Sequence, residues 1–518
     1  MARTKQSTSA QPQTTAQQIG SLIKSARDIM RKDKGLSTDL DRLPLLTWIM
    51  FLKFLDDMEQ IEESKDKMRG ERHRPAIEPP YRWRDWAVRE DGITGPELLA
   101  FINQDEATLP NRKRGPGLLA MLRSLTGGNG AARRRRVIAT VFKDINCRMI
   151  SGYLLRDVIN KINGIHFLAK EEVFTLGHFY ETMLREMRDA AGQNGEFYTP
   201  RPVVKFMVEV VDPRLGETVL DPACGTGGFL VEAYQHLERQ CKTVADRRTL
   251  QDKSILGGEA KPLPFLLCQM NLLLHGMEAP DIDPENSLRF KLTEMGDKDR
   301  VDVILTNPPF GGEEEAGIRG NFPADMQTSE TALLFLQLIM RKLKRPGARS
   351  DKGGRTAVVV HDGTLSGDGV CARVKEQLLT EFNLHTIVRL PNGVFAPYTP
   401  IPTNLLFFDR SGPTREVWYY EHPLPEGRKN YTKTMPIQFE EFRPCLDWWN
   451  KRRASDNAWK VSAKELLASG CNLDRKNPNG QEDITHLPPD QLAEDILRKE
   501  QRIIEIMATI RAALRDKS

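Results

Sequence analysis

The chain lacks the features that would place it among disulfide-rich, zinc-binding or membrane proteins. Its seven cysteines are scattered over 518 residues and no two form a CxxC pair. This pattern argues against a disulfide framework or a zinc site and predicts reduced, mostly buried thiols. No apolar run is long enough to span a membrane. Residues 1–18 lack the apolar core of a signal peptide, so we expect a disordered polar tail and a cytoplasmic protein.

A strong excess of one charge is also missing, since the formal net charge is only +4. This value is too small to identify a partner. Two local clusters are densely basic, at residues 112–114 and 133–136. Each cluster fits either contacts with phosphates or a surface that faces solvent or an acidic protein, and both interpretations stay open.

Two regions differ in their hydrophobic patterning. Residues 19–165 predict a helical domain that contains the stretch LLTWIMFLKFLDDMEQIEE and no convincing strand pattern. In residues 166–475, short apolar runs alternate with helical stretches; the runs are ETVLDPAC, KSILGGEA, VDVILTNPP, RTAVVVHDG, HTIVRLPNG and NLLFFDR. The alternation predicts an α/β domain with a mainly parallel sheet, whose ligands bind at the carboxyl ends of the strands.

Residues 476–518 predict a polar linker followed by a helix from about residue 490. Apolar residues recur there at helical spacing: Leu492, Ile496, Ile503, Ile506, Met507, Ile510 and Leu514. An apolar stripe of this kind needs a partner. The helix either packs back on its own domain or contacts another subunit, and we favour the contact with another subunit.

A glycine-rich turn follows the first predicted strand of the α/β domain, in DPACGTGGFL. Glycines such as Gly227 and Gly228 permit a tight turn and close approach of the backbone to a ligand. The spacing is not that of a phosphate-binding P-loop. With Asp221 at the strand end, the turn suits a ligand that bears an ammonium group, such as S-adenosylmethionine. The alternative is a turn that only packs a helix on the sheet.

Glu259 follows the next predicted strand, in KSILGGEA. A carboxylate at this position can accept hydrogen bonds from ribose hydroxyls. A solvated loop carboxylate is the alternative, but the preceding glycines and the strand end favour a ligand contact.

The sequence NPPF, residues 307–310, follows the apolar strand VDVILT. The exocyclic amine of adenine is a weak nucleophile, and the side-chain oxygen of Asn307 and the carbonyl of Pro308 can accept its two N–H bonds. Pro308 and Pro309 fix the backbone that aims these acceptors, and Phe310 offers a face on which an extruded base stacks. The alternative is a strand-terminating turn, but two motifs at one sheet edge favour an active site.

These residues resemble a known family. DPACGTGGF with NPPF resembles the amino-methyltransferases of DNA. More closely, QNGEFYTPRPVVKFMVEVV, LPNGVFAPYTPIPTNLLFF and CNLDRKNP resemble the modification subunit of type I restriction–modification systems, over roughly residues 20–515. The resemblance implies a Rossmann-like S-adenosylmethionine-dependent methyltransferase domain with a helical N-terminal domain and a C-terminal helix. It implies methylation of N6 of adenine in DNA, at a site read by a specificity subunit that binds two modification subunits and, in some systems, a restriction subunit.

The resemblance also assigns residues. It places EFYTPR in the cofactor pocket, and the residues carried over are Glu196, Phe197, Tyr198, Thr199, Pro200, Arg201, Thr226, Gly227, Gly228, Glu259 and Asn286. Thr199 is expected to cap a helix whose first turn carries Pro200. Cys224 departs from the small residue of many relatives, which makes it a candidate for oxidation.

Two other functions compete with DNA methylation. NPPF also serves the methylation of glutamine amides in proteins, and a cofactor-binding scaffold without catalysis is the non-enzymatic alternative. The helical N-terminal region counts against the first, and the intact NPPF counts against the second. The chain shows no obvious target-recognition domain of its own, so the recognised DNA sequence cannot be read from it.

Overall fold

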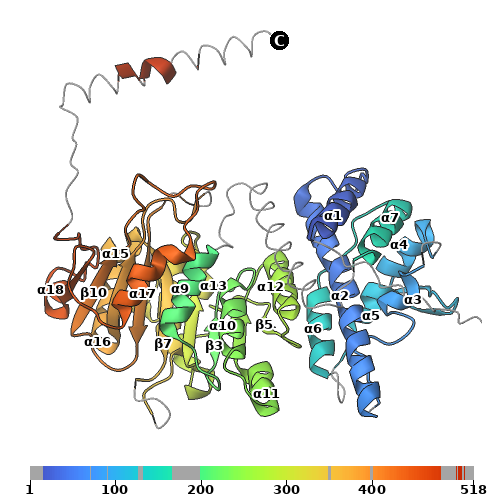
Figure 1. Ribbon diagram of the computed structural model, residues 1–518, viewed down its shortest axis with the longest axis horizontal. Helices are drawn as coiled ribbons and strands as arrows, with labels where there is room; N and C mark the ends of the chain where they lie inside the picture. The colour runs from blue at the N-terminus through green and yellow to red at the C-terminus, as the bar shows by residue number, and fades with distance from the viewer. Residues whose placement is uncertain are drawn as a thin grey trace, which may run out of the picture. The chain divides into compact units, whose positions relative to one another are not determined.

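The computed structural model describes residues 16–70, 72–89, 92–126, 132–165, 199–347, 352–396, 399 and 401–479, together with 497–498, 500–503 and 507. The chain divides into two compact units, Met1–Arg475 and Lys476–Ser518. All helices and strands named below belong to the first unit (Figure 1). None of the helices in the described ranges combines the length and the hydropathy of a membrane span.

The N-terminal part of this unit is helical, as the sequence predicts. Its longest element, α2, has Thr38 before its first turn, where the side chain of Asp41 accepts from both the backbone N–H and the hydroxyl of Thr38 at 2.9 Å. Gly70 ends the helix in the left-handed conformation, with φ of 73°. The helices are α1 (Ala16–Met30), α2 (Asp39–Arg69), α3 (Trp83–Trp86), α4 (Gly95–Asn103), α5 (Leu118–Arg123), α6 (Ala132–Phe142) and α7 (Gly152–Asn163).

A two-stranded antiparallel hairpin interrupts these helices. It joins β1 (Glu106–Thr108) to β2 (Arg114–Pro116). The expectation that residues 19–165 contain no strand is therefore wrong. The strands have three residues each, which is too short for an alternating pattern to show in the sequence.

The basic cluster at residues 133–136 lies on α6. Three of its arginines form ion pairs with acidic side chains of other elements: Arg133 with Asp252, Arg134 with Glu62 and Arg135 with Glu78. Neither interpretation left open above included these ion pairs within the chain.

The second part of the unit is built on a nine-stranded sheet of order β11-β10-β8-β9-β7-β6-β3-β4-β5. The five strands from β5 to β7 in this order are parallel, whereas β9 is antiparallel to both neighbours and β11 is antiparallel to β10. The strands are β3 (Val219–Asp221), β4 (Ile255–Gly258), β5 (Asp281–Asp283), β6 (Val303–Thr306), β7 (Arg355–His361), β8 (Asn383–Arg389), β9 (Thr403–Asp409), β10 (Glu416–Glu421) and β11 (Ala458–Ser462). A parallel centre with helical crossovers is the Rossmann-like α/β fold that the alternating pattern predicts.

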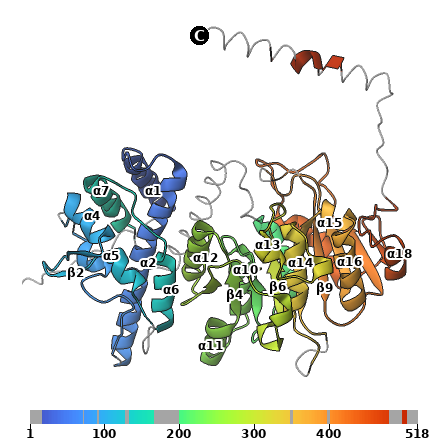
Figure 2. The same ribbon diagram turned by 180° about the vertical axis from the view of Figure 1, so that it is seen from behind.

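Helices connect these strands and cover the sheet (Figure 2). They are α9 (Arg201–Val211), α10 (Gly228–Glu238), α11 (Val244–Lys253), α12 (Pro262–Leu274), α13 (Ala316–Arg319), α14 (Thr331–Lys342), α15 (Asp362–Ser366), α16 (Val370–Glu381), α17 (Arg443–Trp449) and α18 (Ala463–Ala468). Single 3-10 turns are η2 (Leu292–Glu294), η3 (Asp297–Asp299), η4 (Ala324–Met326) and η5 (Phe439–Phe442).

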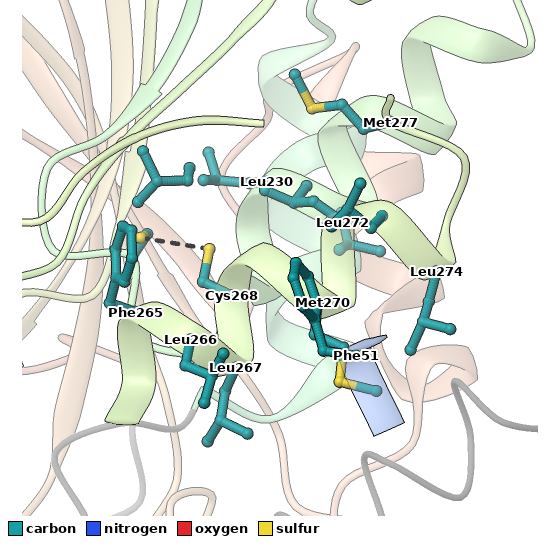
Figure 3. Packing of buried hydrophobic residues seen from close by; sticks show 14 of the residues in the cluster. Phe51, Leu230, Phe265, Leu266, Leu267, Cys268, Met270, Leu272, Leu274 and Met277 are labelled. Atoms are coloured by element: carbon teal, nitrogen blue, oxygen red, sulfur yellow. Dashed lines mark hydrogen bonds between the residues drawn. The ribbon is translucent and has the colours of Figure 1, made fainter. Parts of the chain in front are cut away.

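Helix α12 is buried along nearly its whole length, because every residue from 264 to 274 is enclosed. It is mostly apolar, with Gln269 and Asn271 as its polar residues, which is typical of a helix with protein on each face. Phe51 of α2 lies beside Met270 on one side of it, and Cys268 on the other side lies 3.6 Å from the sulfur of Cys224 (Figure 3). The helix therefore joins the helical part of the unit to the glycine-rich turn.

Candidate functional site

The two motifs singled out in the sequence meet at the centre of the sheet. Strands β3 and β6 are neighbours, and the chain continues from β3 to β4 and β5 on one side and from β6 to β7 on the other. The strand order therefore reverses between β3 and β6, which is where ligands bind in open α/β sheets. Asp221 ends β3 and Thr306 ends β6, and the Thr306 hydroxyl donates to Asp221 Oδ1 at 2.6 Å. Asn307 follows directly.

The glycine-rich turn closes over this point in a conformation that needs glycine. Gly225 and Gly227 have φ of 54° and 81°, in the left-handed region where a side chain is strained. A Cβ on Gly227 would lie 2.8 Å from Cys268 Sγ. Gly227 is also the residue before the first turn of α10, whose N-terminal N–H groups attract electronegative ligand atoms.

Side chains from other elements hold the turn in place. Arg201 Nη1 donates to the carbonyl of Gly228 at 3.0 Å, and Asn271 Nδ2 on α12 donates to the carbonyl of Thr226 at 2.9 Å. The Ser287 hydroxyl donates to the carbonyl of Pro222 at 2.7 Å. Neither Asn271 nor Ser287 stands out in the sequence, because hydrogen bonds across the fold leave no local pattern.

Asp221 is an enclosed carboxyl group with few hydrogen bonds. Its pKa is raised to about 7, mainly by burial and to a smaller extent by the nearby Glu259, although the Thr306 hydroxyl and the Ala223 N–H act to lower it. A cation placed beside Asp221 would favour the charged carboxylate, so the site fits a ligand with a positive group.

Glu259 lies directly under the turn, at the end of β4. Its Oε2 accepts from the Gly225 N–H at 3.0 Å and its Oε1 from the Lys261 N–H at 2.8 Å. Glu259 is 9% exposed, so it is not the solvated loop carboxylate of the alternative interpretation. These hydrogen bonds fix the Glu259 side chain at the edge of the sheet where the parallel strands end.

Asn286 follows β5 on the same edge and is held by the protein. Its Oδ1 accepts from the Leu288 N–H at 2.9 Å and its Nδ2 donates to Glu314 Oε2 at 3.3 Å. Glu314 lies in the segment after NPPF, so Asn286 connects the two halves of the site.

Asn307 has a buried acceptor without a partner. Its Oδ1 forms no hydrogen bond within the described part of the chain. A buried carbonyl oxygen in this state costs about 1–3 kcal/mol until a donor reaches it. Two N–H bonds of an exocyclic amine, one to this oxygen and one to the adjacent backbone carbonyl, would remove the cost.

An aromatic cluster lies beside this acceptor. The Phe310 ring meets His361 edge-on, with centroids 5.8 Å apart, and meets Phe395 at 6.3 Å. Burial lowers the pKa of His361, which Glu330 and Asp362 oppose. Phe395 belongs to LPNGVF, a stretch that supported the family resemblance, yet neither it nor His361 was identified as a site residue from the sequence.

The EFYTPR stretch is described only in part. Glu196, Phe197 and Tyr198 lie outside the described residues. Thr199 and Pro200 precede α9, and the expectation that Thr199 caps this helix is wrong. Pro200 has an extended backbone, with ψ of 131°, so the helix starts at Arg201 and its first turn carries Pro202.

Comparison with known families points to the same chemistry. A family model described as N-6 DNA Methylase matches residues 171–486, and a model described as the HsdM N-terminal domain matches residues 19–162. Together they match both parts of the first unit.

Individual relatives match nearly the full length. The chain is 48% identical over 486 residues to the type I restriction enzyme EcoEI methylase subunit of Escherichia coli, which covers 92% of the chain and 94% of the relative. A crystal structure assigned as a type I restriction enzyme modification subunit from Vibrio vulnificus YJ016 is 70% identical, with a TM-score of 0.86 over 92% of the chain and 100% of that structure. A structure from work on complex assembly of the type I R-M system is 40% identical, with a TM-score of 0.74 over 98% and 100%.

Proposed function

The chain belongs to the N-6 DNA methylase family as a type I restriction–modification methylase subunit, an adenine-specific DNA methyltransferase, and on this premise we propose its reaction. It transfers a methyl group from S-adenosylmethionine to N6 of adenine, in DNA sites chosen by a separate specificity subunit. The observation that carries the proposal is the buried Oδ1 of Asn307, which has no hydrogen-bond partner among the described residues.

Asn307 and Pro308 activate and orient the adenine amine. Asn307 Oδ1 accepts one N–H and the Pro308 carbonyl accepts the other, which holds the nitrogen lone pair toward the methyl donor. The two prolines fix these acceptors before the base arrives, so little ordering remains during the reaction. Phe310 stacks on the extruded base.

The residues around the turn would hold the cofactor, which supplies the electrophilic methyl group when bound. Asp221 would face its ammonium group, Glu259 would accept from its ribose hydroxyls, and the backbone of Thr226, Gly227 and Gly228 would lie close against it. The further contacts that we propose come from Glu196, Phe197, Tyr198, Thr199, Pro200, Arg201 and Asn286. The buried carboxyl of Asp221, whose pKa lies near 7, fits this assignment.

The subunit works within a larger assembly. We propose two copies of this chain with one specificity subunit on DNA, and contact with a restriction subunit where the system has one. Support comes from the 40% identical structure, which was determined to explain complex assembly of the type I R-M system. The apolar stripe of the predicted terminal helix is the surface that we assign to subunit contact.

The reaction can be tested by mapping N6-methyladenine in the DNA of a host that expresses the chain with its specificity subunit. We expect methylation at one discrete DNA motif, and strongly reduced methylation there when Asn307→Ala replaces the wild type. Absence of methylation by the wild-type complex, with S-adenosylmethionine bound, would contradict the proposed reaction.

A further inference from the structure

A basic loop lies on the same edge of the sheet as Asn307. Strand β10 is parallel to β8, β8 is antiparallel to β9, and β9 is antiparallel to β7. Strands β10, β8, β7 and β6 therefore point in one direction, and the chain that leaves each of their carboxyl ends lies on one edge. The loop after β10, which joins it to η5 and α17, rises from this edge (Figure 1). We call its residues 426–435 the basic loop.

Packing connects the basic loop to the base-binding motif. Phe395 contacts Phe310 and belongs to the segment after β8. In that segment, the Asn392 carbonyl accepts from the Tyr431 N–H at 3.0 Å. A Cβ on Gly393 would lie only 2.1 Å from the Tyr431 carbonyl oxygen, so the two backbones pack closely. The basic loop is thus fixed beside the segment that carries Phe395.

A buried side chain holds the basic loop on the protein, and the tip of the loop is exposed. Tyr431 is buried and its hydroxyl donates to the Glu441 carboxylate. Thr432 and Met435 exchange two backbone hydrogen bonds of 3.2 Å, which form a tight turn with Lys433 and Thr434 at its tip. Lys433 and Thr434 are exposed at this tip, and the hydroxyls of Thr432 and Thr434 share a hydrogen bond of 3.2 Å.

The charge of the loop is positive. It carries Arg428, Lys429 and Lys433 against a single acid, Glu426. Lys429 is exposed, whereas Arg428 Nη1 is buried and forms an ion pair with Glu441 Oε1 at 3.6 Å. Lysine, arginine, threonine and backbone N–H groups are the donors that contact phosphates of nucleic acids.

The other flank of NPPF is acidic. Residues 313–315 are three consecutive glutamates, and Glu313 and Glu315 are exposed. Phosphates approaching Asn307 are repelled on this flank and attracted on the flank of the basic loop. The charges at this edge therefore favour a DNA strand whose phosphates lie on the side of the basic loop.

We propose that the basic loop binds the phosphates of the DNA strand beside the target adenine, so that the extruded base reaches Asn307 in a fixed register. This inference rests on the proposed function and adds the surface of this chain that holds the DNA backbone. The contacts are to phosphates, so they add affinity and register without reading the sequence.

The test compares two double variants in the assembled complex with its specificity subunit. Lys429→Ala/Lys433→Ala removes two cations from the basic loop. Lys253→Ala/Lys464→Ala removes two exposed cations from the opposite edge, at the end of α11 and the start of α18. DNA affinity of both variants and the wild type is measured over a range of salt concentrations, with S-adenosylmethionine present.

The logarithm of DNA affinity falls as the logarithm of salt concentration rises. For the loop variant, we expect this slope to be shallower by about 1.8, since each lost phosphate contact removes about 0.9. The control variant should keep the wild-type slope, and Lys429→Arg/Lys433→Arg should restore it. An unchanged slope in the loop variant, or an equal loss in the control, would overturn the proposal. Methylation by the wild-type complex is scored separately, so failure of the proposed reaction is distinguishable from failure of the loop.

Discussion

At the scale of single residues, the site gathers groups that are unfavourable in isolation. Asp221 is a carboxyl enclosed by protein, Asn307 has a buried oxygen that no donor of the described residues reaches, and Gly227 has a left-handed backbone. Each state costs free energy in the folded protein, and such states concentrate where a ligand relieves them. These three groups lie at one edge of the sheet. Together they favour the binding of two ligands there: a cofactor with a positive charge and an amine.

Asp221 makes stability depend on pH. Its folded pKa of about 7 lies above the ordinary value of about 3.9. The stability linked to this group is therefore fully present below about pH 4 and is lost as the pH rises through 7. We compare the free energy of unfolding of Asp221→Asn with that of the wild type, measured in denaturant. On going from pH 5 to pH 8, we expect the difference to shift in favour of the variant by about 2–3 kcal/mol, because only the wild type loses this stability.

Asp281→Asn serves as the control, because Asp281 is an exposed acid at the start of β5. It should follow the wild type at both pH values. A difference between Asp221→Asn and the wild type that does not change with pH would show that Asp221 is already charged in the folded protein at pH 5.

Gly227 can be tested by a coupled pair of substitutions. Gly227→Ala should destabilise the chain by about 1–2 kcal/mol through its left-handed φ, and further through the approach of its Cβ to Cys268 Sγ at 2.8 Å. It should also weaken S-adenosylmethionine binding, because the turn must shift.

Cys268→Ala removes the sulfur and relieves the approach, so the double variant should be less impaired than the sum of the single effects by more than about 0.5 kcal/mol. Unfolding and cofactor affinity are measured for all four proteins of the cycle. If the effects of the two substitutions simply add, the Cβ introduced at Gly227 does not press on Cys268, and the turn lies farther from α12 than this approach requires.

The sequence predicts residues of the site where they lie in motifs and misses those that act across the fold. Asp221 ends a strand, and Glu259 and Asn307 directly follow strands; these positions can be located from apolar runs. Asn271 and Phe395 come from other elements, and only the folded chain brings them to Thr226 and Phe310. Helix starts are also uncertain by a residue, as the position of Thr199 shows.

At the scale of elements, α12 has two roles. It supports the glycine-rich turn through Cys268 and Asn271, and it packs against α2 through Met270 and Phe51. One buried helix therefore packs against both the helical part of the unit and the glycine-rich turn.

Packing around α2 can be measured directly. Phe51 is 0% exposed, and Phe51→Ala should lower the free energy of unfolding by about 3–5 kcal/mol through lost contacts and a cavity. Met68 lies on the same helix and is 87% exposed, so Met68→Ala should change stability by less than about 0.5 kcal/mol. Equal effects of the two substitutions in denaturant unfolding would refute this packing.

The six apolar runs of the α/β region correspond to β3, β4, β6, β7, β8 and β9. Strands β5, β10 and β11 were missed: β5 has three residues with charged ends, and β10 and β11 lie toward the sheet margin with exposed positions. The mainly parallel sheet was predicted, but the antiparallel β9 was not, because strand direction depends on pairing partners that are distant in sequence.

At the scale of the whole molecule, the two units have separable roles in our account. A chain that ends at residue 489 should keep the melting temperature and cofactor affinity of the full chain, since the sheet and its helices belong to the first unit. It should assemble poorly with the specificity subunit, because it lacks the apolar stripe. Size-exclusion chromatography of the co-expressed subunits checks this, and a normal complex would reject the assigned contact surface.

The central claim is that one half of the edge holds the cofactor and the other half activates adenine. The most direct measurement is single-turnover methyl transfer by the assembled Asn307→Ala complex, with S-adenosylmethionine affinity measured on the same preparation. We predict cofactor affinity close to that of the wild type and a transfer rate lower by about 10²–10³-fold, the usual effect of removing one aligned hydrogen-bonding group. Transfer at the wild-type rate, or loss of cofactor binding together with transfer, would contradict the account.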